Sequence, residues 1–98
     1  MVELRGPDDE VLGTVPDPRF LLADATRSQF SECRLLRYLV PWGDTMFNQA
    51  QAEDLAADLR LVLAKHSGGP LGHILNSIQP LVDRLAGDPN HYLWFLGD

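Results

Sequence analysis

The segment PWGDTMFN, residues 41–48, separates two different patterns of apolar residues and decides how the rest of the chain is laid out. Before it, residues 33–40 form a short run that is apolar on both faces when drawn as a strand, with a short helix as the alternative. After it, apolar residues between positions 51 and 66 recur every three or four residues, as on one face of an α-helix. Because Pro41 and Gly43 break regular structure, we expect a strand to end and a helix to begin within this segment.

The helix that follows is predicted to span residues 49–66. Asn48 with Gln51 three positions later fits a capping box, in which each side chain bonds a backbone N–H group at the helix start. Asp44 or Thr45 could instead cap an earlier start.

A second helix is predicted after the break at residues 67–69. An apolar stripe runs from Leu71 to Leu85, and Gly87 fits the C-terminal cap. Pro80 interrupts the stripe, and a proline inside a helix costs about 3 kcal/mol. We therefore expect a kink or two short helices meeting near Gln79.

Strands are predicted on both sides of these helices. Residues 2–5 and 11–15 alternate in polarity around turn formers at 6–9, which indicates a β-hairpin. Residues 91–96 form a last apolar strand, which would promote aggregation if left unpaired. Its expected neighbour is the run at 33–40, read as a central strand.

These elements predict a single α+β domain over residues 1–98, with a mainly antiparallel sheet of about four strands and two helices packed on one face. Residues 19–32 are expected to be irregular, with one helical turn at most. The last two strands are apolar on both faces. Either residues 19–32 cover the second face, or that face, with Tyr38, Tyr92 or Trp94, meets a partner or a second copy of the chain.

Composition narrows the classes of partner. Fourteen acidic residues against eight Lys and Arg give a net charge of −6, which disfavours nucleic acid and favours a basic protein partner. Cys33 is the only cysteine, so an intrachain disulfide is impossible and a buried thiol in a reducing compartment is expected. No apolar run approaches the roughly 18 residues of a membrane span. The expectation is a cytoplasmic protein that does not bind membranes.

No cofactor or metal site is expected from the motifs. His66, His73 and His91 lack the spacing of metal ligands, and the segment Ser67-Gly68-Gly69 lacks the Lys-Ser/Thr context of a phosphate loop. Asp44 is the best candidate for a special carboxylate, but capping of the helix start explains it without any ligand and is the preferred interpretation. An enzyme would require Asp44 and His91 to converge within about 3 Å as acid and base.

A resemblance rests on the pattern Gly43–Asn48 with Gln51, followed by His91 and Gly97-Asp98. This pattern is similar to one in small uncharacterised bacterial proteins and covers the chain from about Arg34 onward. It implies no chemistry for any residue. In size and acidity the chain is also similar to toxin-neutralising immunity proteins as a class.

The sequence therefore predicts a small acidic protein-binding module, of the immunity or inhibitor kind, that occludes a partner. Its anchors would be Trp42, Tyr92 and Trp94, with Asp44 among the surrounding acids. The alternatives are a structural homodimer that uses an open sheet face and, third, the small enzyme with Asp44 and His91. The leading hypothesis, the binding module, predicts no catalytic residues.

Overall fold

The structure is a computed structural model that describes residues 1–29 and 32–97, without the side chains of residues 27–29. Its elements follow the order β1 (Val2–Arg5), β2 (Val11–Val15), α1 (Leu21–Gln29), the 3₁₀ helix η1 (Leu36–Tyr38), β3 (Thr45–Asn48), the 3₁₀ helix η2 (Gln49–Gln51), α2 (Ala52–Leu63), α3 (Gly69–Ala86) and β4 (Tyr92–Phe95).

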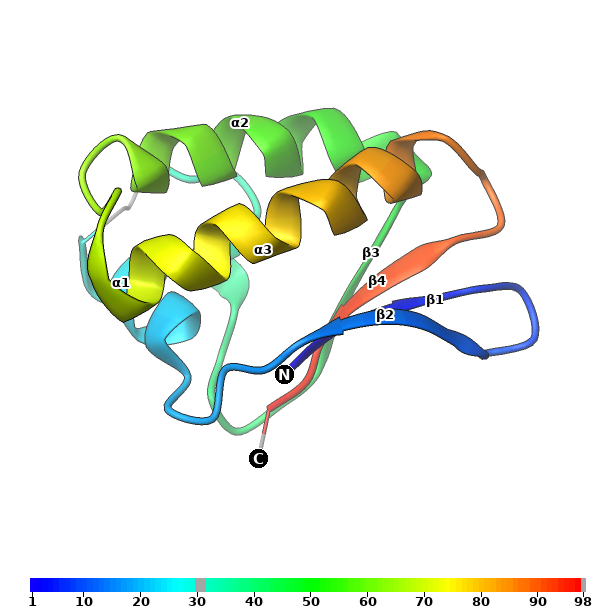
Figure 1. The fold of residues 1–98 in the computed structure, drawn as a ribbon, viewed down its shortest axis with the longest axis horizontal. Helices are drawn as coiled ribbons and strands as arrows, with labels where there is room; N and C mark the ends of the chain where they lie inside the picture. The colour runs from blue at the N-terminus through cyan, green and yellow to red at the C-terminus, as the bar shows by residue number, and fades with distance from the viewer. Residues whose placement is uncertain (30–31, 98) are drawn as a thin grey trace.

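The four strands form one antiparallel sheet in the order β2-β1-β4-β3. The terminal strand β4 is central, and its Leu93 lies opposite Leu4 of β1 and Phe47 of β3. Helix α3 contacts β1, β2 and β4, and α2 packs beside α3. Both helices lie on the same side of the sheet (Figure 1). The α+β architecture with two helices on one face is therefore confirmed, as is the hairpin of β1 and β2.

The core lies between the sheet and these helices. Alternate strand residues point into it, because successive side chains of a strand lie on opposite faces. Its strand members, each at most 7% exposed, are Val2, Leu4, Val15, Phe47, Leu93 and Phe95. From the helices, Leu55, Leu59, Val62, Leu75, Ile78, Val82 and Leu85 complete it.

The predicted strand at 33–40 is wrong. This segment forms a loop and η1, and the strand beside β4 is β3, taken from the segment expected to start a helix. The physical reason is Asp58 of α2, whose carboxylate accepts hydrogen bonds from the backbone N–H groups of residues 34–36. Those groups are therefore unavailable to a sheet, and Cys33, Leu36 and Leu39 are buried in the core from a loop and a 3₁₀ turn instead.

The described residues 19–29 are more regular than predicted. Helix α1 begins after Asp17, whose two carboxylate oxygens accept the N–H groups of Leu21 at 2.9 Å and Leu22 at 3.1 Å. Phe20 adopts a left-handed backbone conformation with φ of 53° at this corner. Helix α1 contacts η1 and α3, so it does not form the cover that one interpretation placed over the second face of the sheet.

The two long helices differ from prediction only in detail. Helix α2 follows η2, and the capping box of Asn48 and Gln51 is present. Helix α3 is one continuous element with Pro80 inside it, so the alternative of two short helices is wrong. Pro80 and Asn76 are both exposed. The Asn76 carbonyl, which loses its donor at residue 80, lies where water can bond it, and this lowers the cost of the proline.

Candidate functional site

The face of the sheet opposite α2 and α3 is the principal candidate surface. The strand register places Thr14, Glu3, Trp94 and Met46 in one row and Val11, Arg5, Tyr92 and Asn48 in the next. We call these eight residues the open face. Across the described ranges 1–29 and 32–97, no helix lies over it (Figure 1).

Apolar side chains are unusually prominent on the open face. Met46 is 44% exposed and Val11 52% exposed, while Tyr92 and Trp94 are half-buried between them. An antiparallel sheet with one solvated face normally shows polar residues there. Tyr92 and Trp94 of β4 thus lie together as predicted, on a surface suited to contact with another molecule.

One ion-pair network crosses the open face. The Arg5 guanidinium lies 4.9 Å from the centroid of the Trp94 ring, in the geometry of a cation–π contact. Its nitrogens donate to Glu3 Oε1 at 2.7 and 3.0 Å and to Asp9 at 3.2 Å. The hydrogen bond that Arg5 donates to Glu3 is the main cause that raises the pKa of Arg5 above its usual value. Two carboxylates therefore balance this cation.

Acidic residues surround one end of the open face. Asp8, Asp9 and Glu10 form the β1–β2 turn, and Asp88 precedes β4. Figure 1 shows this hairpin turn and the α3–β4 turn at the same end of the molecule. Because Arg5 is already paired with two carboxylates, this end presents excess negative charge to an approaching partner.

Trp42 lies in the loop that precedes β3 and is 65% exposed. The backbone of this loop packs closely against Gly97, where a Cβ atom would collide with the backbone of Gly43 and Pro41. Asp44 fixes the same contact, because its Oδ1 accepts the Gly97 N–H at 2.9 Å. Trp42 is thereby held beside the end of β4, outside the strand register that defines the open face.

Asp44 does not cap a helix, so that interpretation was wrong. It precedes β3, and the cap of the following helical segment is Asn48. The carboxylate is exposed, and its hydrogen bond joins the loop to the last residues of the described chain. This contact gives a structural reason for Asp44 and for the glycine at position 97. Asp98 lies outside the described residues.

Asp44 and His91 do not converge. In the β3–β4 register Asp44 adjoins the Thr45–Phe95 pair, whereas His91 adjoins the Asn48–Tyr92 pair at the other end. At about 3.3 Å per residue these ends are more than roughly 10 Å apart. The His91 ring instead lies 3.4 Å from Asp88. The hypothesis of an acid–base pair formed by these two residues is therefore wrong.

Asp58 is a buried carboxylate bound by three backbone N–H groups, and the sequence analysis did not identify it. It is 4% exposed and receives the N–H groups of Arg34, Leu35 and Leu36 at 2.8–3.0 Å. A signal was present, because position 58 lies three residues after Leu55 and so falls on the apolar stripe. A buried acid must have partners. Here the backbone supplies them, which defines a structural role.

Cys33 lies next to this site and is fully buried. Burial, followed by the negative charges of Asp58 and Glu32, raises the pKa of its thiol to about 11. The thiolate is the reactive form of cysteine, so at neutral pH this side chain is inert. The expectation of a buried thiol is confirmed.

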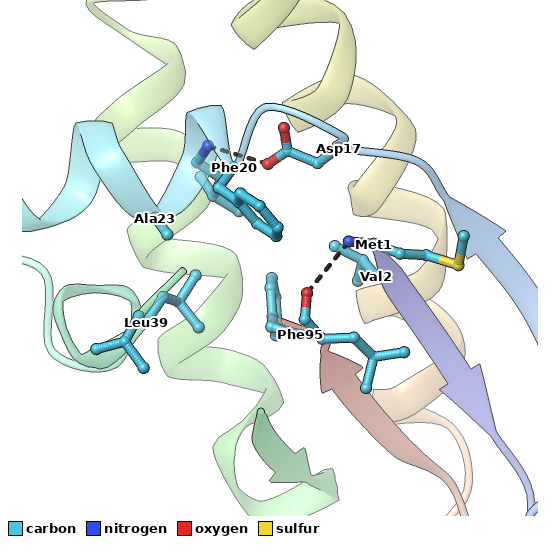
Figure 2. Close-up of a pocket in the computed structure, with 10 residues that line it drawn as sticks. Met1, Val2, Asp17, Phe20, Ala23, Leu39 and Phe95 are labelled. Atoms are coloured by element: carbon cyan, nitrogen blue, oxygen red, sulfur yellow. Dashed lines mark hydrogen bonds between the residues drawn. The ribbon is translucent and has the colours of Figure 1, made fainter. Parts of the chain in front are cut away.

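A small apolar cavity lies between α1 and the ends of β1 and β4. Figure 2 shows the Phe20 ring pointing into it, opposite Val2 and Phe95. Its volume of about 30 Å³ has room for roughly one water molecule. The Asp17 carboxylate at its margin is already bonded to the start of α1. This cavity is a packing gap, too small for a substrate.

Within the described part of the chain, no group of three or more His, Cys, Asp or Glu residues is arranged to hold a metal ion. No helix among the described residues is long and apolar enough to cross a membrane. Comparison of the chain with protein-family models, curated proteins and solved structures found no match. The resemblance of residues 34–98 to small bacterial proteins stays a prediction, and function has to be argued from the surfaces described above.

Proposed function

We propose that this protein is a small acidic binding module, of the immunity or inhibitor kind, that occludes a protein partner with its open face. The observation that carries the proposal is the pair Tyr92 and Trp94 of β4 beside exposed Met46 of β3, on a sheet face with no helix over it in the described chain. Aromatic residues and methionine are enriched at protein interfaces, and aromatic anchors dominate binding energy.

Charge supports a basic partner. The net charge of −6 and the carboxylates of the hairpin turn would accelerate encounter with a positively charged surface. Burial of the aromatic pair would then slow dissociation. A single buried cysteine suits a reducing compartment, and we include cytoplasmic location in the proposal.

The size of the open face indicates that neighbouring loops take part. Four strands of four to five residues span roughly 14 by 13 Å, well below the roughly 800 Å² per partner of a standard interface. The hairpin turn and the Trp42 loop would extend the contact. Trp42 would then act as a second anchor, and Asp44 would hold its loop against Gly97.

The test is affinity capture from the source cell with matched variants. Met46→Arg places a cation on the open face beside Trp94, and Asn76→Arg places the same cation on the exposed side of α3. We expect one specific basic protein to bind the wild type and the Asn76 variant and to be lost with the Met46 variant. Capture of no basic protein, or equal capture by both variants, would contradict the proposal.

A structural homodimer is the second candidate, and the same exposed side chains favour it, because two copies could bury Met46 and Trp94 against each other. The small area predicts a weak dimer at most. Light scattering from micromolar to millimolar concentration separates the two functions, since a strict monomer over this range excludes the dimer.

A further inference from the structure

A second surface, distinct from the open face, has the features of a small-molecule site. A cleft of about 330 Å³ lies between the corner before α1 and the first turns of α3. Its walls are largely apolar and come from Pro18, Leu21, Pro70 and Ile74. It is open to solvent on one side, and its volume lies at the lower end of the range for ligand pockets, about 300–1,000 Å³.

This cleft carries the cation Arg19, although the protein as a whole has a net charge of −6. Arg19 and His73 line it, and both side chains belong to exposed residues. Among the described residues Arg19 has no ion pair, unlike Arg5 and Arg34. Asp17 also lines the cleft, but both of its oxygens accept N–H groups of α1. An unpaired guanidinium therefore adjoins an apolar wall in a chain with net charge −6.

We propose that this cleft binds a small amphipathic carboxylate, with an alkyl or aryl body against Leu21 and Ile74 and its carboxylate on Arg19. A guanidinium can bind a carboxylate through two parallel hydrogen bonds, which fixes the orientation of the ligand. His73 on the same cleft offers a further donor. An uncharged ligand of the same length would keep the apolar contact and lose the polar one.

The experiment is an NMR titration with decanoate below its micelle-forming concentration, with decanol as the uncharged probe. Arg19→Gln removes the charge from the cleft, and Arg34→Gln removes an equally exposed charge whose pair with Asp54 is 3.8 Å long. Both positions are exposed, so both variants should fold, and their amide spectra check this.

We expect decanoate to cause saturable shifts at Leu21, His73 and Ile74, and to bind about threefold more weakly to Arg19→Gln, as for an exposed charge pair. Decanol should bind both variants like the wild type, and Arg34→Gln should bind decanoate unchanged. The proposal is overturned by shifts without saturation, by shifts centred on Trp94 and Met46, or by equal decanoate affinity in the two variants. None of these outcomes affects the proposal for the open face.

Discussion

At the scale of single residues, Asp58 shows how one side chain can decide local structure. Its two oxygens receive three backbone N–H groups from a segment about 22–24 positions earlier. Asp58→Asn replaces one acceptor oxygen by an NH₂ donor that would face N–H donors. We expect a loss of about 3 kcal/mol in the free energy of unfolding, measured by urea denaturation.

The control is Asp54→Asn, in the same helix. Asp54 has 48% of its side chain exposed, and its nearest cation, Arg34, is 3.8 Å away. Exposed pairs of this kind contribute about 0–1 kcal/mol. Similar losses in the two variants would show that Asp58 does not hold residues 34–36 in solution.

Cys33 gives a prediction about pH. The ordinary pKa of a cysteine thiol is 9.0, and burial raises the pKa of Cys33 to about 11 in the folded protein. Between these values the unfolded chain has released the proton and the folded chain retains it, so stability falls as pH rises. The contribution of the thiol to the free energy of unfolding is complete below pH 9 and lost above about pH 11. Between these values the free energy of unfolding falls by at most about 1.4 kcal/mol per pH unit.

The measurement is the free energy of unfolding of the wild type and of Cys33→Ala from pH 8 to 11. Lysines and tyrosines titrate in both proteins, so the difference between the two curves isolates the thiol. We expect the advantage of the wild type to shrink over this window. Parallel curves would mean that the thiol is not buried as described.

At the scale of elements, the sequence was informative where periodicity is long and turns are marked. The hairpin, the apolar stripe of α3 and the Asn48–Gln51 box were predicted from local patterns. The strand predicted at residues 33–40 was wrong because a short apolar run has the same composition in a strand and in a buried loop. What distinguishes them is Asp58, a contact distant in sequence.

The candidate site was partly predictable for the same reason. Alternation along β4 placed Tyr92 and Trp94 on one face. Met46 could not be assigned to the same face from the sequence. The segment Thr45–Asn48 was expected at the start of a helix, whereas it forms an edge strand. Asp44 was assigned to a cap for the same reason, whereas its partner is Gly97 at the far end of the chain.

The contact between the Trp42 loop and β4 can be tested through glycine. A Cβ atom at Gly97 would collide with the backbone of Gly43 and Pro41, and backbone can relax only at a cost. We expect Gly97→Ala to lower the free energy of unfolding by about 1–3 kcal/mol, measured by urea denaturation. Asp44→Asn retains one acceptor oxygen and should cost less.

Gly87→Ala is the matched control. Gly87 has φ of −86°, and an added Cβ there would make only ordinary contacts. Restricting the unfolded chain should leave this variant neutral or more stable by up to about 1 kcal/mol. If both alanine variants behave alike, the close approach at Gly97 is not a constraint in solution.

At the scale of the whole molecule, the fold is one-sided. Helices α2 and α3 lie on one face of the four-stranded sheet, and across the described chain no helix covers the other face. The sequence predicted two alternatives for the second face of the sheet, because strands that are apolar on both faces need either a cover or a partner. Helix α1 contacts η1 and α3, so the described part of residues 19–32 does not provide that cover, and Met46 and Val11 are exposed on the open face.

Two adjacent residues of β3 have different expected roles, since Phe47 lies in the core and Met46 lies on the open face. Phe47 is 4% exposed and packs edge-on against Phe95 with ring centroids 5.6 Å apart, whereas Met46, next to it, is 44% exposed on the open face. Phe47→Ala should cost about 3–5 kcal/mol, and Met46→Ala about 1 kcal/mol or less, at low protein concentration. Raising the concentration should not change the cost of Met46→Ala for a monomeric module, and should increase it if two copies bury this side chain. A large cost at every concentration would mean that the open face is covered within the monomer, and the proposed function would then lose its surface.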